Sequence, residues 1–458
     1  MKIVEREWLA DEQDTYIDTL VDRAVAAQKE VQTWSEEATD KLLQALAQSV
    51  YLYAEELAIA TVQETRMGNV RDKTFKNRFA SIGIYRSLEG RIGQGLLAVD
   101  RQNKIMTFAS PMGVVFGLLP ATHPTSTFIF KVLIALKGRN ALILSPSRRA
   151  SGVSNKMGEL IQQVLREQGA PADLVQWVDA SSSRTTVSSL MAHPGISFIL
   201  ATGGPELVKA AYRSGTPAIG VGAGNAPVLV CADADLSLAA RNIVSSRAFD
   251  NGLACCAENH LVVVKSRVEA FQAALEEHEA AVLSTEETQR LLHVIVDPAT
   301  NRLKASIIGQ TASDIAEWAS IKRSHPIQVL VVPTQKVSEH NPLAREKLAP
   351  LLSLFSVANE QAGMKICEEL LVLEGSGHTA IIYTSSTHLT HEYGARMPAS
   401  RILVNTPGMQ GGIGMVTGLQ PSLTLGCGTF GGTSTTDNVT YTHLLNIKRV
   451  AYSTPSRR

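Results

Sequence analysis

Residues 113–146 read GVVFGLLPATHPTSTFIFKVLIALKGRNALILSP, and this stretch carries the pattern that decides the fold. The apolar run from Gly113 to Pro120 predicts a buried strand, and the stretch from Thr125 to Leu136 predicts a helix. The run from Ala141 to Pro146 predicts a second buried strand directly after that helix. Apolar strands that alternate with helices are typical of a parallel sheet covered on both faces.

The same alternation continues along most of the chain. We predict helices at residues 154–168, 185–191 and 205–213, and strands at residues 174–178 and 196–200. Later in the chain we predict four more strands, at residues 261–264, 328–332, 351–355 and 379–383, with helices between them. Such sheets bind ligands beyond the carboxyl ends of their strands. The fold class that follows is α/β, with two parallel sheets.

The two ends of the chain differ from this pattern. Helices are predicted over about the first ninety residues, because apolar residues recur there at three- and four-residue steps. Examples are Leu43, Leu46, Val50, Tyr53 and Leu57. Short strands are predicted at residues 104–110 and 443–452. We therefore divide the chain into residues 1–249, 250–432 and 433–458.

Composition excludes several classes of protein. The 458 residues include 43 basic and 43 acidic ones, so the formal charge is zero and no block of like charge suits nucleic acid or an anionic membrane. No apolar run approaches the length of a membrane span. The five cysteines show no metal-ligand spacing, so we expect no metal and a reduced, cytoplasmic protein.

The most informative stretch for chemistry is FDNGLACCAEN, at residues 249–259. Asn251-Gly252 favours a tight turn with positive φ, so the backbone can double back there and present a side chain. Cys255 follows this turn among small residues, which is a position suited to a nucleophile. The alternative is a structural cysteine, because free cysteine is among the most buried residue types.

Three glycine-rich turns suggest a nucleotide site. The first follows a predicted strand and opens a predicted helix, so its backbone N–H groups suit an anion. None of the three has the G-x-G-x-x-G fingerprint after the first strand, and turns use glycine routinely, so an ordinary turn is the alternative for each. The turns lie at residues 201–205, 220–225 and 425–432.

Taken together, these segments resemble the CoA-acylating branch of the aldehyde dehydrogenase superfamily. The likeness is closest to the acetaldehyde dehydrogenase module of bifunctional aldehyde–alcohol dehydrogenases, and the chain ends before an alcohol dehydrogenase domain, so we expect the aldehyde-oxidising module standing alone. The matching motifs are Pro124–Thr127, Ala201–Gly204, Val208–Tyr212, Pro217–Asn225, Phe249–Gly252, Glu346–Pro350, Gly377–Thr379, Asn405–Pro407, Gly411–Gly414 and Thr424–Gly428.

The resemblance implies a fold and a set of site residues. The fold is aldehyde dehydrogenase-like, with a dinucleotide-binding domain (1–249), a catalytic domain (250–432) and an oligomerisation arm formed by residues 104–110 and 433–458. Cys255 becomes the nucleophile, His378 handles the CoA thiol proton, and Glu346 contacts a cofactor ribose. The other residues expected to bind the nucleotide are Leu118, Pro120, Ala121, Thr122, His123, Thr202, Gly203, Gly204, Gly222 and Leu425.

The implied reaction converts a short aliphatic aldehyde, CoA and NAD or NADP reversibly to an acyl-CoA. Acetaldehyde is the favoured substrate, with succinate semialdehyde or sulfoacetaldehyde as alternatives. Remoter alternatives are an acyl-phosphate reductase and a non-catalytic assembly subunit. Arg148 and Arg149 suit a 2′-phosphate, but surface arginines are commonplace, so the choice between NAD and NADP stays open. We expect a homo-oligomer in the cytoplasm, with a bacterial microcompartment as the alternative location.

Two departures from the family pattern affect the chemistry. Hydrolytic relatives carry a glutamate general base in a Glu-Leu-Gly-Gly-Lys motif, and residues 221–225 here read VGAGN. Without that carboxylate, water is a poor second nucleophile, which favours a thiol acceptor. In addition, His123 stands where the branch usually has asparagine, so a titratable ring replaces a neutral amide donor.

Overall fold

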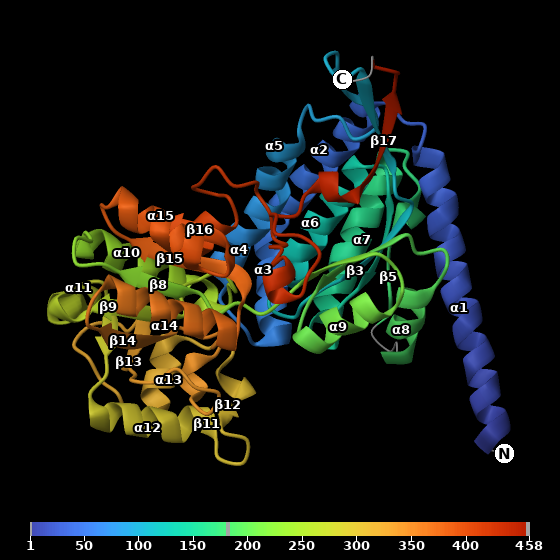
Figure 1. Ribbon diagram of the computed structural model, residues 1–458. Helices are drawn as coiled ribbons and strands as arrows, with labels where there is room; N and C mark the ends of the chain where they lie inside the picture. The colour runs from blue at the N-terminus through green and yellow to red at the C-terminus, as the bar shows by residue number, and fades with distance from the viewer. Residues whose placement is uncertain (1, 180–183, 455–458) are drawn as a thin grey trace.

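The computed structural model describes residues 2–179 and 184–454, with side chains described from residue 15 onward. Two α/β lobes lie side by side, and the long helix α1 runs along the outside of the first lobe (Figure 1). The last four residues of the predicted C-terminal segment, 455–458, lie outside the described part of the chain.

The first lobe is built on a parallel sheet, as residues 113–146 predict; it has five strands, of which the one at residues 218–221 was not predicted. Its strand order is β5-β4-β3-β6-β7, so β4 and β5 lie on one side of β3, and β6 and β7 lie on the other side. The order therefore switches direction between β3 and β6. Register is continuous across the switch, because Phe116 pairs with Ile143 on one side and with Ile199 on the other. The strands are β3 (Val114–Leu118), β4 (Ala141–Ser145), β5 (Val175–Trp177), β6 (Phe198–Thr202) and β7 (Ala218–Val221).

Helices cover both faces of this sheet. Helix α6 is buried over its whole length, in keeping with its continuous apolar sequence. Two further helices, α2 and α7, pack against it. The helices of this lobe are α1 (Lys2–Val31), α2 (Glu36–Leu52), α3 (Ala54–Thr65), α4 (Val70–Arg78), the π-helical turn Phe79–Gly83, α5 (Ile84–Leu88), α6 (Pro124–Lys137), α7 (Ser151–Glu167), α8 (Arg184–Ala192) and α9 (Pro205–Arg213).

The second lobe contains a seven-stranded parallel sheet in the order β10-β13-β14-β9-β8-β15-β16. Its strands alternate with helices and bury apolar residues on both faces, and four of the seven strands were predicted. The strands are β8 (Pro227–Val230), β9 (His260–Val264), β10 (Ala280–Val282), β13 (Val329–Pro333), β14 (Leu351–Val357), β15 (Gly377–Tyr383) and β16 (Ala399–Val404). The helices are α10 (Leu236–Ala248), α11 (Val268–Glu277), α12 (Thr285–Ile295), α13 (Ala312–Trp318), α14 (Glu360–Leu373), α15 (Thr387–Arg396) and α16 (Gly408–Gly412).

The change of sheet comes earlier in the chain than the predicted boundary at residues 249 and 250. Strand β8 precedes that boundary, yet it pairs with β9 and β15 in the second sheet. The chain therefore crosses between the sheets at residues 222–226, after β7. Both β7 and β8 are short apolar runs beside one glycine-rich turn, and apolar content does not show which sheet a strand joins.

A small antiparallel sheet forms an arm, which appears with the C-terminal strand at the top of Figure 1. The predicted strands at 104–110 and 443–452 are present as β2 (Ile105–Pro111) and β17 (Leu445–Ala451), and they pair with each other. Strand β1 (Gly95–Asp100) was not predicted and completes the sheet. A two-stranded hairpin, β11 (Val296–Asp297) and β12 (Arg302–Leu303), lies in the second lobe.

Candidate functional site

The turn before Cys255 has an unusual backbone. Asp250, Asn251 and Gly252 are consecutive residues with positive φ, at 49°, 55° and 74°. Glycine is required at the last of them, because a Cβ there would lie 2.4 Å from the carbonyl carbon of Ala349. The predicted Asn-Gly turn is therefore present, and its left-handed conformation begins one residue earlier, at Asp250.

The side chain of Asp250 holds this turn against helix α4. The carboxylate is fully buried and forms ion pairs with Lys73, at 3.1 Å, and with Lys76. It also accepts a hydrogen bond of 3.0 Å from the backbone N–H of Asn69. Burial and the neighbouring Lys76 lower the pKa of Lys73 to about 8, while Asp250 opposes that shift. A buried carboxylate held by two cations fixes the turn, since removing Asp250 would leave two buried cations without a counter-ion.

The two adjacent cysteines have different surroundings. Cys255 is half-buried, whereas Cys256 is buried and its Sγ lies 3.7 Å from the carbonyl oxygen of Met409. The neighbouring Cys256 and burial raise the pKa of the Cys255 thiol to about 12, and His378 acts in the opposite direction. Of the two thiols, Cys255 is the one that a substrate could reach.

The structure brings His378 to Cys255 from strand β15. The ring is fully buried, and its Nδ1 lies 3.0 Å from Oγ1 of Thr379. Its Nε2 has no hydrogen-bond partner among the described residues. A buried ring nitrogen without a partner is unusual, so Nε2 is available to a group that enters the site.

Glu346 also lies beside the nucleophile. Its Oε1 accepts a hydrogen bond of 3.0 Å from the backbone N–H of Gly224. Burial raises the pKa of Glu346, and Cys255 and Glu374 add to the effect. A Cβ on Gly224 would lie only 1.8 Å from the carbonyl oxygen of Cys255, so the glycine allows the two chains to touch. Residues 221–225 thus reach the nucleophile without supplying a carboxylate.

Most of the residues predicted to bind a nucleotide lie at the topological switch point of the first sheet, whereas Glu346, Gly222 and Leu425 lie outside it. Leu118 ends β3 and pairs with Ala201 of β6, so the loops that follow these strands start side by side. One loop contains Pro120, Ala121, Thr122 and His123, and the other contains Gly203 and Gly204. Lys131 of α6 ties the strands together by donating hydrogen bonds to the carbonyl oxygens of Leu118, at 2.5 Å, and of Leu200, at 2.7 Å.

The polar groups at this edge fit a dinucleotide. Oγ1 of Thr202 is buried and has no partner among the described residues. Gly204 precedes the first turn of α9, and a Cβ there would meet open space. Unpaired helix N–H groups and an open glycine suit a phosphate. Gly222 follows β7 and likewise faces open space, while Leu425 is buried and bridges to Asn438.

His123, the residue that departs from the family pattern, belongs to the same cluster as Asp250. Nζ of Lys76 lies 2.7 Å from Nδ1 of His123. Lys73 donates a hydrogen bond of 3.1 Å to the carbonyl oxygen of Thr122. Burial, Lys76 and Lys73 together hold the pKa of His123 well below its ordinary value.

Sequence reasoning missed several charged residues that the structure buries near the site. Arg247 of α10 is 1% exposed, and burial lowers its pKa to about 10. Glu258 is fully buried, and burial raises its pKa to about 7 while its Oε1 accepts a hydrogen bond of 2.6 Å from the N–H of Gly408. Charged residues usually face solvent, so the sequence carries no signal that these two positions are buried.

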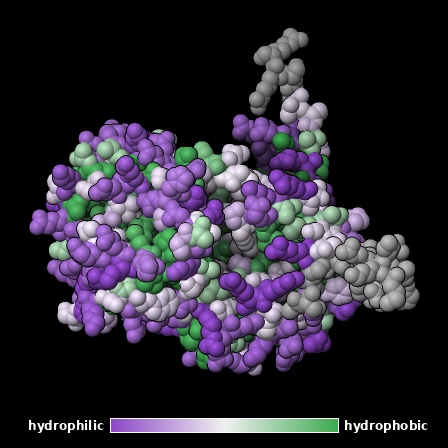
Figure 2. Space-filling view, turned by 90° about the horizontal axis from the view of Figure 1, so that it is seen from below, coloured by the Kyte–Doolittle hydropathy of each residue, from purple (hydrophilic) through white to green (hydrophobic). Residues whose placement is uncertain are grey.

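An apolar cluster surrounds the nucleophile's turn. Its buried members are contributed by the turn itself, by α16 and by the C-terminal glycine-rich segment. Seen from below, apolar side chains gather toward the middle of the face, where the two lobes meet (Figure 2). The cluster contains Ala254, Cys256, Ala257, Met409, Ile413 and Leu425, with Phe79, Phe249, Met415 and Leu423 packed against it.

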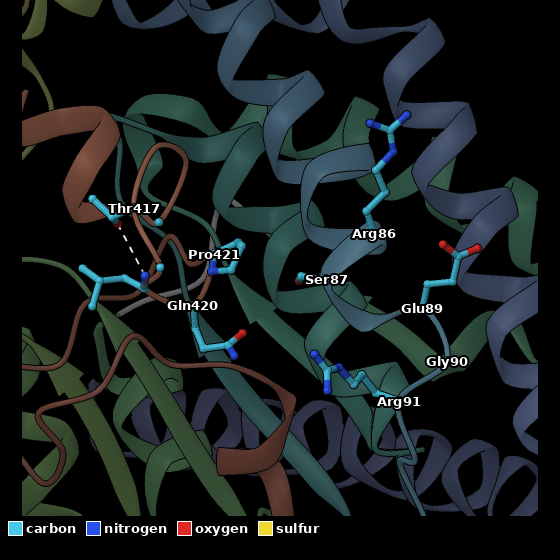
Figure 3. Close-up of a pocket in the computed structure, with 11 residues that line it drawn as sticks. Arg86, Ser87, Glu89, Gly90, Arg91, Thr417, Gln420 and Pro421 are labelled. Carbon is cyan, nitrogen blue, oxygen red and sulfur yellow. Dashed lines mark hydrogen bonds between the residues drawn. The ribbon is translucent and has the colours of Figure 1, made fainter.

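Two polar cavities lie elsewhere, between α5 and the loop after α16. One has a volume of about 520 Å³, and Figure 3 shows Arg91 and Gln420 pointing into it. The other, of about 470 Å³, shares Ser87 and Arg91 with the first and reaches Arg401. Neither is lined by a predicted site residue.

The described residues include no acidic, histidine and cysteine group suited to a metal, and none of their helices combines the length and apolarity of a membrane span.

Comparison with known proteins agrees with this architecture. A family model described as the aldehyde dehydrogenase family matches residues 7–444. The chain is 40% identical over 440 residues to the bifunctional aldehyde-alcohol dehydrogenase of Escherichia coli K12, and the match covers 95% of this chain and 49% of that protein. The chain thus spans about half the length of this relative. A sulfoacetaldehyde dehydrogenase from Acholeplasma is 35% identical, over 95% of this chain and 91% of that protein.

Solved structures match over nearly their whole length. An acetylating aldehyde dehydrogenase from Geobacillus thermoglucosidasius superposes with a TM-score of 0.93, at 37% identity, and the match covers 98% of each chain. A propionaldehyde dehydrogenase from Rhodopseudomonas palustris, solved with bound CoA and an acylated cysteine, has a TM-score of 0.86 at 26% identity, covering 95% of this chain and 97% of that one. The predicted α/β fold and the resemblance to the CoA-acylating branch are confirmed. The chain therefore belongs to the aldehyde dehydrogenase family, and its relatives include acetylating members.

Proposed function

We propose that this chain oxidises a short aliphatic aldehyde with NAD or NADP and passes the acyl group to CoA, through a thioester on Cys255. The observation that carries the proposal is the position of this half-buried thiol, at a strained turn beside Gly224, Glu346 and the unpartnered Nε2 of His378. Of the solved structures named above, one is an acetylating aldehyde dehydrogenase and one holds CoA, and that agrees with this assignment.

In the first half of the reaction, the Cys255 thiolate attacks the aldehyde carbonyl and forms a thiohemiacetal oxyanion. Among the described residues the N–H of Cys255 donates no hydrogen bond, so it is free to stabilise that oxygen. A bound nicotinamide supplies the hydride acceptor that turns the thiohemiacetal into a thioester. The switch-point residues hold the nucleotide at the carboxyl ends of β3 and β6, on the side of the sheet that the turn approaches.

In the second half, the CoA sulfur attacks the thioester carbonyl and the bond from that carbon to Sγ of Cys255 breaks. Nε2 of His378 accepts the proton of the CoA thiol as the new thioester forms. One thioester replaces another, so the exchange is close to balanced and runs both ways. Residues 221–225 supply no carboxylate to activate water, which keeps hydrolysis slow.

The apolar cluster around the turn supports a short aliphatic acyl group. Met409 and Ile413 lie in this cluster with Ala254 and Cys256, the residues on either side of the nucleophile, and offer an acyl chain apolar surroundings. The carboxylate of succinate semialdehyde or the sulfonate of sulfoacetaldehyde would lose hydration in such surroundings. We therefore place acetaldehyde ahead of these two alternatives.

The arm supports assembly into a homo-oligomer. Leu96 and Val99 of β1 and Ile447 and Val450 of β17 are all exposed, although their strands form a continuous sheet. Exposed apolar strands commonly mark a surface that another chain covers. We propose that a second copy of the chain covers this surface of the arm. All five cysteines are free in the structure, which is consistent with a reduced cytoplasmic setting.

The function is tested by following absorbance at the nicotinamide band with a panel of aldehydes, with and without CoA. We expect reduction of the nucleotide to continue only when CoA is present, and acetaldehyde to be turned over best. Rapid oxidation to free acid without CoA would place the chain in the hydrolytic branch. Reduction of an acyl phosphate but not of an acyl-CoA would instead favour the phosphate-dependent alternative.

A further inference from the structure

Asn225 lies where the chain crosses between the two sheets, and its side chain is fully buried. Its Nδ2 donates hydrogen bonds to the carbonyl oxygens of Ala344, at 3.0 Å, and of Leu370, at 3.1 Å. Its Oδ1 accepts hydrogen bonds from Nδ2 of Asn259, at 2.5 Å, and from Nε2 of His260, at 2.8 Å. A carboxamide has two N–H donors and one oxygen with two lone pairs, so every hydrogen-bonding site of this side chain is used.

The partners of Asn225 fix the orientation of its amide. Carbonyl oxygens only accept hydrogen bonds, so Nδ2 faces Ala344 and Leu370, and Oδ1 faces His260. Nε2 of His260 therefore carries the ring proton and donates to Oδ1. A Cβ on Gly375 would lie 2.7 Å from Cβ of Asn225, so the surrounding backbone leaves this side chain no room to turn.

The loop at residues 344–347 is held by this amide and its neighbour. Ala344 accepts a hydrogen bond directly from Asn225. The carbonyl oxygen of Arg345 accepts one of 2.9 Å from Nδ2 of Asn259, which also donates to Asn225. The backbone that leads into residue 346 is therefore anchored at two consecutive carbonyl groups.

Glu346 is the next residue of this loop, and its side chain is half-buried. Its Oε1 accepts a hydrogen bond of 3.0 Å from the N–H of Gly224, the residue before Asn225. Gly224 in turn touches the nucleophile's backbone, because a Cβ there would lie 1.8 Å from the carbonyl oxygen of Cys255. The segment at residues 224 and 225 thus contacts the Glu346 carboxyl group, the loop that carries it and Cys255.

We propose that Asn225 is a positioning residue that holds the Glu346 carboxyl group in place relative to Cys255, so that nucleotide binding depends on it. The proposal rests on the proposed function in one respect, namely that Glu346 contacts the nucleotide. Because the Asn225 side chain is fully buried, it acts through the loop at residues 344–347 and does not itself contact the nucleotide.

Asn225→Asp separates the two sides of this network. The variant keeps the shape of the side chain and the oxygen that accepts from Asn259 and His260. A carboxyl group carries at most one proton, so at least one of the carbonyl oxygens of Ala344 and Leu370 loses its donor. The variant therefore releases the loop, while the start of β9 keeps its partners.

The test is the dissociation constant of reduced nucleotide, NADH or NADPH, whichever the parent binds more tightly, titrated by its fluorescence. Four forms of the full chain are compared: the parent, Asn225→Asp, Glu346→Leu and the double variant. We expect each single variant to raise the dissociation constant about tenfold, since each loses a hydrogen bond on which the bound nucleotide depends. The double variant should bind no more weakly than Glu346→Leu alone, because Asn225 acts through Glu346.

A second measurement separates this role from general damage to the site. The rate at which iodoacetamide alkylates Cys255 without nucleotide, followed in a Cys256→Ala background, should be the same with Asn225→Asp as without it. Asn301→Asp is the matched control for binding, since Nδ2 of the exposed Asn301 also donates to a carbonyl oxygen, that of His340 at 2.7 Å. This control should leave the dissociation constant unchanged.

Asn225→Ser keeps the proposal testable if Asn225→Asp does not fold. It brings no charge into the core, and its hydroxyl group has one proton, so at least one of the two carbonyl oxygens again loses its donor. A parent-like dissociation constant in these variants, losses that multiply in the double variant, or slower alkylation of Cys255 would overturn the proposal. A parent-like value in Glu346→Leu would overturn the nucleotide role of Glu346 as well, so the two failures are distinguishable.

Discussion

Nζ of Lys76 lies 2.7 Å from Nδ1 of His123, and this contact determines which ring nitrogen of the histidine carries the proton. An ammonium group only donates hydrogen bonds, so Nδ1 accepts and the proton of the neutral ring resides on Nε2. The depressed pKa of His123 keeps the ring neutral. The histidine therefore presents one neutral N–H donor, as the asparagine usual in this branch would.

Replacing Lys76 with methionine is expected to make the activity sensitive to acid. The variant removes one of the causes that depress the pKa of His123, so that pKa rises and the ring gains a proton at a higher pH than in the parent, although burial and Lys73 still oppose it. A new acid-side loss should appear in the pH profile of kcat/KM. The double variant Lys76→Met, His123→Asn should lack that loss, since its amide does not titrate. A profile unchanged by Lys76→Met, or a loss that persists in the double variant, would contradict this account.

Gly224→Ala is expected to lower activity, because the added methyl group would clash with the backbone of Cys255 and displace its side chain. A methyl group there would lie 1.8 Å from the carbonyl oxygen of Cys255, which is backbone and cannot swing away. Displacing the reacting sulfur by this route should lower kcat/KM by about 100-fold. Gly394→Ala, in helix α15 with open space at its Cβ, is the matched control and should retain full activity. Near-normal turnover by Gly224→Ala would show that the two backbones can separate freely.

His378→Gln is expected to separate the two halves of the reaction. The amide cannot accept the CoA thiol proton, so steady-state turnover should fall by about 100-fold or more. The initial burst of nucleotide reduction, which precedes the CoA step, should keep its amplitude. Stopped-flow absorbance with saturating aldehyde measures both quantities. Loss of the burst amplitude together with turnover would instead assign His378 to the first half-reaction.

Glu258→Gln is expected to change how stability depends on pH. Burial raises the pKa of Glu258 from 4.5 to about 7, so the native state binds the proton more tightly than the unfolded chain does. The stability contributed by this group is therefore complete below the unfolded pKa and is lost as pH rises through about 7. Glutamine still accepts from the N–H of Gly408 and does not titrate.

The free energy of unfolding of Glu258→Gln, measured relative to that of the parent, should therefore rise by up to about 3 kcal/mol when the pH is raised from about 5 to about 8. Urea unfolding at the two pH values measures the difference. Glu277→Gln, on the exposed end of α11, serves as the control and should show little pH-dependent change. A gain that is equal at both pH values would show that burial does not shift the ionisation of Glu258.

Eight strands of the two parallel sheets were predicted because each lies in a short, mainly apolar run. Strands β7, β8, β10 and β16, which are short or interrupted by polar residues, were not predicted. Periodicity does not record which neighbour a strand pairs with. For this reason the change of sheet does not coincide with the predicted boundary at residues 249 and 250, because β8 pairs with β9 and β15. Strand β1 lies in the arm, where most of its residues are exposed, so it lacks the continuous apolar signal of the sheet strands.

The site could be predicted only where it depends on one local stretch. The turn at residues 249–255 could be predicted from Asn251-Gly252 and from the two cysteines that follow it. Helix α4 reads VRDKTFKNR, which is polar on all sides and predicts a solvated helix, yet Lys73 and Lys76 are buried against Asp250. That partner lies more than 170 residues away in sequence.

The most direct test of the central claim is to identify the acylated residue by mass spectrometry. The enzyme would be mixed with acetaldehyde and oxidised nucleotide in the absence of CoA, quenched in acid and digested. We predict an acetyl group on Cys255 that is absent from Cys256 and disappears when CoA is added before the quench. An adduct on Cys256, or none in an enzyme that reduces the nucleotide, would contradict the account.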